Sequence, residues 1–236
     1  MKTWQTLLSD GVQELRKTDT DIDHVITPRN EEVIALLERY IKEIELFNHA
    51  YGLVGTHDNE ELVIKHILDS LAPLGIICRL LKTVNNNEKP LQTSGLNIAD
   101  AGSGAGLPGI PLAIALPACR FTLIERMGRR AGFLLNTKAV LGLSNITVEE
   151  GELEKTEKGR FSLVTFRAFK PLEPKLLSTL FNICAKDGII SAYKGRHDKI
   201  EKEVLQFTNN KTYNYEIFHY NVPFLSEDRN LLVIKT

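Results

Sequence analysis

A glycine-rich segment lies between an apolar run and a helical pattern, and it constrains the possible fold more than any other feature. The segment reads Asp100-Ala101-Gly102-Ser103-Gly104-Ala105-Gly106-Leu107-Pro108-Gly109. Glycine has no Cβ atom, so the backbone here can approach a ligand closely. In an open α/β sheet, ligands bind where a strand ends and the next helix begins. The segment therefore predicts a ligand-binding loop on such a sheet rather than a tight turn alone.

Short apolar runs alternate with helical patterns from Leu96 onward, which is typical of a parallel sheet with helices on both faces. The last two runs are joined by a short connection and are expected to pair as a hairpin, bringing one antiparallel strand into the sheet. The pattern thus predicts an α/β fold with a mostly parallel seven-stranded sheet. We expect strands at 96–101, 121–124, 146–148, 163–166, 188–193, 213–222 and 231–234, and helices at 107–116, 128–141 and 171–184.

The residues before this alternation show helical periodicity instead. Apolar positions recur at helical spacing from Glu31, from Asn59, and in a shorter piece from Trp4. The stretch 83–95 is polar and rich in turn formers. The predicted organisation is an N-terminal helical region at 1–82, a loop at 83–95, and a Rossmann-like domain at 96–236.

The composition of the 236 residues excludes several classes of protein. With 43% hydrophobic and 25% charged residues, the chain is neither disordered nor a disulfide scaffold. Its 29 Lys and Arg against 30 Asp and Glu restrict any nucleic-acid contact to a local patch. No membrane span, metal motif or secretory leader is evident, so we expect a cytoplasmic protein. The scattered cysteines are expected to be small core residues: Cys78, Cys119 and Cys184.

The charge beside the glycines indicates the class of ligand. Gly104–Gly109 formally matches the dinucleotide pattern G-x-G-x-x-G, with Glu125 placed to hold a ribose. However, Asp100 would repel a pyrophosphate, and Pro108 and Pro111 remove N–H donors from the helix start. A cationic adenosine compound without phosphates suits this loop better, and S-adenosylmethionine is such a compound.

The arrangement resembles the class I S-adenosylmethionine-dependent methyltransferase pattern, in which an acidic residue precedes three alternating glycines and a second one closes the next strand. Here these residues are Asp100, Gly102, Gly104, Gly106 and Glu125. The resemblance implies that the glycine loop faces the methionine part of the cofactor. It also implies that the Glu125 carboxylate accepts the two ribose hydroxyls.

Four short motifs and a closing strand narrow the resemblance: 66–71 (HILDSL), 106–112 (GLPGIPL), 166–169 (FRAF), 193–195 (YKG) and 228–235 (DRNLLVIK). Together they resemble the bacterial small-subunit (16S) ribosomal RNA guanine-N7 methyltransferases, also called glucose-inhibited division protein B, from about Leu36 to Ile234. The resemblance implies methyl transfer to one guanine, with ribosomal RNA or the assembled small subunit as partner; a monomer is our default expectation. It implies cofactor contacts at Gly102, Leu107, Leu153, Glu154 and Arg167. The family often has Tyr-Asn-Leu-Thr where this chain has Tyr51-Gly52-Leu53-Val54, so no polar role is assigned there.

Guanine N7 carries a lone pair and no proton, so no general base is expected. We expect His66, Asp69 and Arg167 to hold the guanine edge, although His66 could instead pack between domains and Asp69 could pair with a neighbouring cation. Cationic residues after three strands could form one RNA-binding crescent or be ordinary solvated helix ends. They are Arg126, Arg129, Arg130, Lys194 and Arg196, with Lys170 and Lys199 nearby and Phe169 as a candidate for stacking on a base.

Three other functions remain open from the sequence. They are methyl transfer to a small molecule or protein, a non-catalytic S-adenosylmethionine-binding module, and a dinucleotide-dependent oxidoreductase. Product analysis separates them, because only a methyltransferase leaves a methylated product and its chemical identity names the substrate class.

Overall fold

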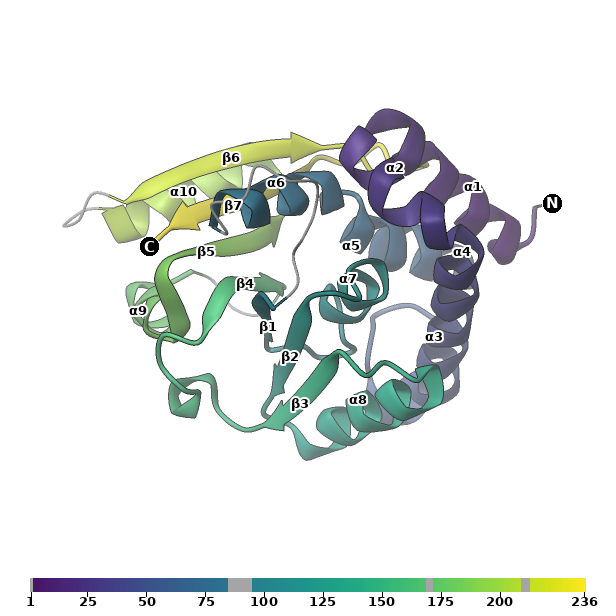
Figure 1. The fold of residues 1–236 in the computed structure, drawn as a ribbon, viewed down its shortest axis with the longest axis horizontal. Coiled ribbons are helices and arrows are strands. Elements are labelled where there is room, and N and C mark those ends of the chain that lie inside the picture. The colour runs from purple at the N-terminus through teal and green to yellow at the C-terminus, as the bar shows by residue number, and fades with distance from the viewer. Residues whose placement is uncertain (1, 85–94, 169–171, 209–212) are drawn as a thin grey trace.

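The computed structural model describes residues 2–84, 95–168, 172–208 and 213–236. A seven-stranded sheet runs through the middle of the molecule (Figure 1), with strand order β3-β2-β1-β4-β5-β7-β6. β7 runs antiparallel to both β5 and β6, and the other paired strands among the described residues are parallel, which confirms the predicted mixed sheet. The strands are β1 Asn97–Ala101, β2 Arg120–Glu125, β3 Ile146–Glu150, β4 Phe161–Arg167, β5 Cys184–Lys194, β6 Asn214–Tyr220 and β7 Arg229–Lys235.

The strand order reverses between β1 and β4, since β2 lies on the other side of β1. In sheets of this kind, the carboxyl ends of the strands at such a switch point form the ligand crevice. The glycine loop follows β1, and Arg167 ends β4. The topology therefore brings these two segments together.

Helices cover both faces of the sheet (Figure 1). The N-terminal elements are α1 Trp4–Thr18, α2 Thr20–Ile26, η1 Thr27–Arg29, α3 Asn30–Tyr51, α4 Asn59–Leu62, the π-helix η2 Val63–Leu68, α5 Asp69–Leu71 and α6 Leu74–Val84. Except for η1, these elements share one hydrophobic cluster with α7 Gly109–Ala115, α8 Gly128–Leu141 and one face of the sheet. A second cluster packs α9 Pro174–Ile183 and α10 His197–Thr208 on the other face, where η3 Leu153–Lys155 also contributes Leu153. The predicted loop at 83–95 lies mostly outside the described residues.

Three details differ from the sequence expectations or complete them. Helix α7 begins at Gly109 instead of Leu107, because the preceding residues form the turn that closes the glycine loop. Helix α10 was not predicted, since its buried stripe consists of only a few apolar residues such as Ile200 and Val204. All three cysteines are buried and none of them forms a disulfide, as expected.

Candidate functional site: two adjoining cavities

The conformation of the glycine loop is stabilised by hydrogen bonds to the Asp100 carboxylate. This carboxylate has no exposed surface, and Oδ2 accepts hydrogen bonds from Ser103 Oγ at 2.6 Å and from the Gly109 N–H at 3.0 Å. Gly102 and Gly106 have φ values of +68° and +92°, a conformation that side chains other than glycine rarely adopt. The sequence pattern therefore specifies a backbone conformation that glycine adopts readily and other residues do not, fixed by a buried carboxylate.

Glu125 ends β2 directly beside this loop. Oε2 accepts from the Gly104 N–H at 2.9 Å, and Oε1 accepts from the Met127 N–H at 2.8 Å. A carboxylate oxygen has two lone pairs, so each oxygen keeps capacity for a second donor. The buried carboxylate is thus fixed in orientation and able to accept two ligand hydroxyls.

A cavity of about 510 Å³ opens above these residues. Backbone at Gly102, the Glu125 carboxylate and the apolar side chains of Ile124, Leu153 and Leu176 line its wall. Glycine backbone, a diol acceptor and an apolar slot fit a nucleoside with an uncharged ring. The predicted cofactor residues Gly102, Glu125, Leu153 and Glu154 meet here.

The remaining predicted cofactor residues lie elsewhere. The loop also contains Gly104, Gly106 and Leu107, which are not among the residues that line this cavity. Arg167 lines a neighbouring cavity. We expected Asp100 to face the ligand, but its side chain points into the protein instead. Burial raises the pKa of Asp100 to about 6, against the hydrogen bonds from Ser103 and Gly109. Its place in the structure is that of a support for the loop.

A second cavity, of about 920 Å³, adjoins the first, and Ala168 lines both. Ala168 follows β4 and has a φ of +49°, a sparsely populated conformation for alanine. Strained residues of this kind cluster at functional sites. The wall consists of Lys65, His66, Asp69, Phe166, Arg167, Ala168, Tyr193, Lys194, Gly195, Lys199, Lys202, Glu203, Tyr220 and Arg229.

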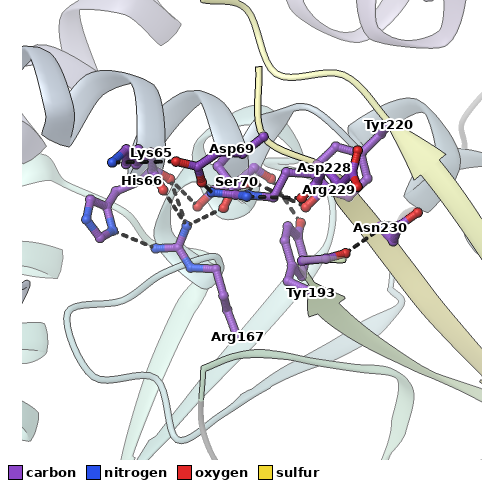
Figure 2. Close-up of polar contacts among 12 residues, drawn as sticks. Lys65, His66, Asp69, Ser70, Arg167, Tyr193, Tyr220, Asp228, Arg229 and Asn230 are labelled. Atoms are coloured by element: carbon purple, nitrogen blue, oxygen red, sulfur yellow. Dashed lines mark hydrogen bonds and ion pairs between the residues drawn. The ribbon is translucent and has the colours of Figure 1, made fainter. Parts of the chain in front are cut away.

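Arg167 is fixed by the π-helix η2 and the residue after it (Figure 2). Nη1 donates to Asp69 Oδ2 at 2.9 Å and to the carbonyls of Lys65 and His66, both at 3.3 Å. Nη2 lies 3.1 Å from His66 Nδ1. The three predicted substrate residues, His66, Asp69 and Arg167, therefore form one cluster. Because π-helical turns recur at functional sites, this local structure agrees with such a role.

His66 is held as a neutral acceptor in this cluster. Burial and the neighbouring Arg167 guanidinium lower the pKa of His66 to about 4. A guanidinium can only donate, so Nδ1 accepts and the ring proton resides on Nε2. The ring is consequently a hydrogen-bond partner for Arg167 rather than a cation at neutral pH.

Asp69 serves the cluster as a shared acceptor. Besides Arg167, its carboxylate accepts from Tyr220 Oη at 3.2 Å and pairs with Arg229 Nε at 3.3 Å (Figure 2). Tyr193 donates its hydroxyl to the Ser70 carbonyl at 2.9 Å. The alternative that Asp69 pairs with neighbouring cations is what the geometry shows. Sequence reasoning missed Tyr193, Tyr220 and Arg229 as site residues, although Tyr193 and Arg229 lie in motifs that it singled out.

The residues predicted to bind RNA are divided between several places. Arg126 and Arg130 line the smaller cavity, but Arg130 also donates to the Gly52 carbonyl at 2.9 Å and so joins α8 to the end of α3. Arg129 is exposed and lines neither cavity. Lys194 pairs with Glu203, and Arg196 with Asp198. Phe169 and Lys170 lie outside the described residues.

The described residues lack two further features. No helix among them is both long and apolar enough to cross a membrane. No group of three or more His, Cys, Asp or Glu side chains in the described ranges is arranged to hold a metal ion.

Solved structures with the same architecture define the class. The chain resembles a putative S-adenosyl-L-methionine-dependent methyltransferase from Methanococcus maripaludis, with a TM-score of 0.55, 13% identity, and coverage of 82% of this chain and 90% of that one. A SAM-dependent methyltransferase from Aquifex aeolicus gives a TM-score of 0.52 at 15% identity, covering 76% and 94%. At these identities the likeness shows the fold alone, which is the class I methyltransferase fold.

Sequence relatives identify the family. Residues 33–233 match GidB, described as rRNA small subunit methyltransferase G. A Ribosomal RNA small subunit methyltransferase G of Treponema denticola is 38% identical over 217 residues, covering 85% of each chain. The protein of that name in Treponema pallidum is 36% identical over 234 residues, covering 98% of this chain and 93% of its own. The chain belongs to the GidB family, and its cofactor is S-adenosylmethionine.

Proposed function

We propose that the protein transfers a methyl group from S-adenosylmethionine to N7 of a guanine in small-subunit (16S) ribosomal RNA. The observation that carries this proposal is the meeting of two cavities at Ala168. One has the carboxylate acceptor and apolar wall that suit an adenosine, and the other is rich in cations. The family relatives named for small-subunit ribosomal RNA support the same substrate.

The cofactor fits the smaller cavity by its chemistry. Glu125 would hold the ribose hydroxyls, the apolar Ile124 and Leu153 would contact the adenine, and Gly102 would allow close backbone approach. S-adenosylmethionine supplies a methyl group on a positively charged sulfur. The buried Asp100 would support this binding indirectly, by fixing the loop that the cofactor contacts.

Arg167 is the residue placed to orient guanine. Its contacts within the described residues use Nη1 and one hydrogen of Nη2. Nε–H and the second Nη2 hydrogen remain, and O6 of guanine is an acceptor that arginine commonly binds. N7 attacks with its own lone pair, so the site needs orientation and matched charge rather than a base. This agrees with a neutral His66 that accepts a hydrogen bond from Arg167.

We further propose that one chain acts as a monomer, because a single chain carries both cavities. The region 1–82 would contribute to the RNA side through His66 and Asp69, and the domain at 96–236 would bind the cofactor. A ribosomal RNA substrate implies work in the bacterial cytoplasm.

The test uses methyl-labelled S-adenosylmethionine with small subunits, naked ribosomal RNA, or a metabolite extract. The proposal expects label in RNA. Glu125→Gln should weaken cofactor binding in calorimetry at least tenfold, whereas Glu157→Gln, an exposed control, should not. Label in a small molecule, or cofactor binding with no product, would overturn the proposal.

A further inference from the structure

The larger cavity carries six cationic side chains, and most of them are already neutralised. Lys65 pairs with Glu61 at 2.9 Å, and Lys194 pairs with Glu203 at 2.8 Å. Arg167 and Arg229 share the Asp69 carboxylate. A cation that already has a carboxylate partner gains less from a second anion, because its charge is partly compensated. These four side chains are therefore weak candidates for binding a further anion.

The other two cations are Lys199 and Lys202 on α10. Within the residues that the structure describes, neither ammonium has a carboxylate oxygen within 4.0 Å. Three residues apart on a helix, the two side chains are neighbours on one face. Both are exposed and both line the cavity.

The acidic residues near these lysines have closer cationic partners. Asp198 accepts two hydrogen bonds from Arg196, at 2.9 and 3.0 Å, and Glu201 lies 3.7 Å from His197. Glu203 Oε1 accepts from Lys194 and also from the Leu172 N–H at 2.5 Å. The side chains that could neutralise the two lysines on their own helix therefore have other partners.

Helix α10 is also firmly anchored. Ile200 and Val204 are each only 2% exposed and pack into the second hydrophobic cluster. The Glu203 contact to the Leu172 backbone ties the helix to the segment that follows β4. The two ammonium groups therefore extend from a fixed scaffold into the space next to Arg167.

We propose that Lys199 and Lys202 form a phosphate-binding site for the backbone of the RNA strand that carries the target guanine. This rests on the proposed function, because it assumes an RNA substrate in the larger cavity. Lysine binds phosphate as a mobile point charge, which suits a backbone contact that positions the strand without reading its sequence. Lys194 and Arg196, which the sequence pattern favoured, are the paired neighbours of this site.

The test compares Lys199→Gln/Lys202→Gln with Lys17→Gln/Lys186→Gln, which removes the same charge from exposed lysines on α1 and at the opposite end of β5. Each phosphate contact on a single strand contributes about 0.7 to the slope of log affinity against log salt. The first variant should therefore lose about 1.4 from the slope of log KM for RNA. With equal KM values at 1 M salt, where the electrostatic contribution vanishes, this corresponds to a rise in KM of about 25-fold at 0.1 M salt. The kcat and the Kd for S-adenosylmethionine should not change, and Lys199→Arg/Lys202→Arg should restore the slope.

The outcomes separate this proposal from the proposed function. An unmodified protein that labels no RNA would refute both. If the unmodified protein labels RNA and the Gln variant keeps its salt slope, only the phosphate site is refuted. A loss equal to that of the Lys17/Lys186 control would also refute it, because the effect would then be one of net charge.

Discussion

Replacing Asp69 by alanine is expected to destabilise the fold, since one carboxylate holds two guanidinium groups. The Asp69 side chain is 5% exposed, and those of Arg167 and Arg229 are 14% and 17% exposed. Removing one partner of a buried ion pair costs about 3–5 kcal/mol, because the other charge is left uncompensated. Both guanidiniums retain other contacts, His66 for Arg167 and Glu227 for Arg229. We therefore expect a loss of about 3 kcal/mol, at the lower end of that range.

The assay is urea unfolding of Asp69→Ala beside a matched surface control. Asp10→Ala breaks a surface pair with Lys2, whose side chains are 36% and 66% exposed, and should cost less than about 1 kcal/mol. In thermal unfolding, about 3 kcal/mol corresponds to a fall of roughly 6–12 °C for a chain of this length. If Asp69→Ala loses no more stability than Asp10→Ala, the argument that Asp69 organises the cluster is refuted.

Three further outcomes follow from the described contacts. The folded pKa of Asp100, about 6, lies above its ordinary value of 3.8, so its favourable contribution to stability is present below pH 3.8 and is lost as the pH rises through 6. The unfolding free energy relative to Asp100→Asn should therefore fall by about 2 kcal/mol between pH 4 and 7, and a flat difference would contradict this. The folded pKa of His66, about 4, lies below its ordinary value of 6.5, so its favourable contribution to stability is present above pH 6.5 and is lost as the pH falls through 4. Imidazole NMR at pH 5.5 should therefore show a neutral ring protonated on Nε2, and a cationic ring at that pH would contradict this. The Tyr40 hydroxyl donates a hydrogen bond to the Ala105 carbonyl of the glycine loop at 2.6 Å. Tyr40→Phe should therefore lower the free energy of unfolding by about 1–3 kcal/mol in chemical denaturation and weaken S-adenosylmethionine binding in calorimetry. Unchanged values would show that this contact does not support the loop.

The sequence predicted the sheet well because its signals are local. Most strands are apolar runs bounded by turn residues, and the glycines after β1 need φ values that other residues avoid. Helix α10 carried too few apolar residues for the same reasoning, although Ile200 and Val204 are buried. This helix becomes evident only in the folded protein, where Ile200 and Val204 pack into the second hydrophobic cluster.

The site was predicted less completely, since its contacts join distant segments. Glu125 and Gly102 line a cavity as their spacing suggested. The sequence could not show that the Asp100 side chain points into the protein, because the charge of a residue does not indicate in which direction its side chain points. Nor could it show that Tyr220 and Arg229 meet Asp69, which lies about 150 residues earlier, because the pairing depends on the insertion of β7 beside β5.

Methylation at N7 is the central claim, and it has a chemical signature. An N7-methylated guanine is cationic, and mild reduction followed by aniline cleaves the RNA strand there, whereas methylation at the exocyclic amine does not. Small-subunit RNA labelled by this protein should be cut by that treatment at one guanine, and the label should co-migrate with 7-methylguanosine after digestion. Labelled RNA that is not cut, or label in another nucleoside, would contradict the account.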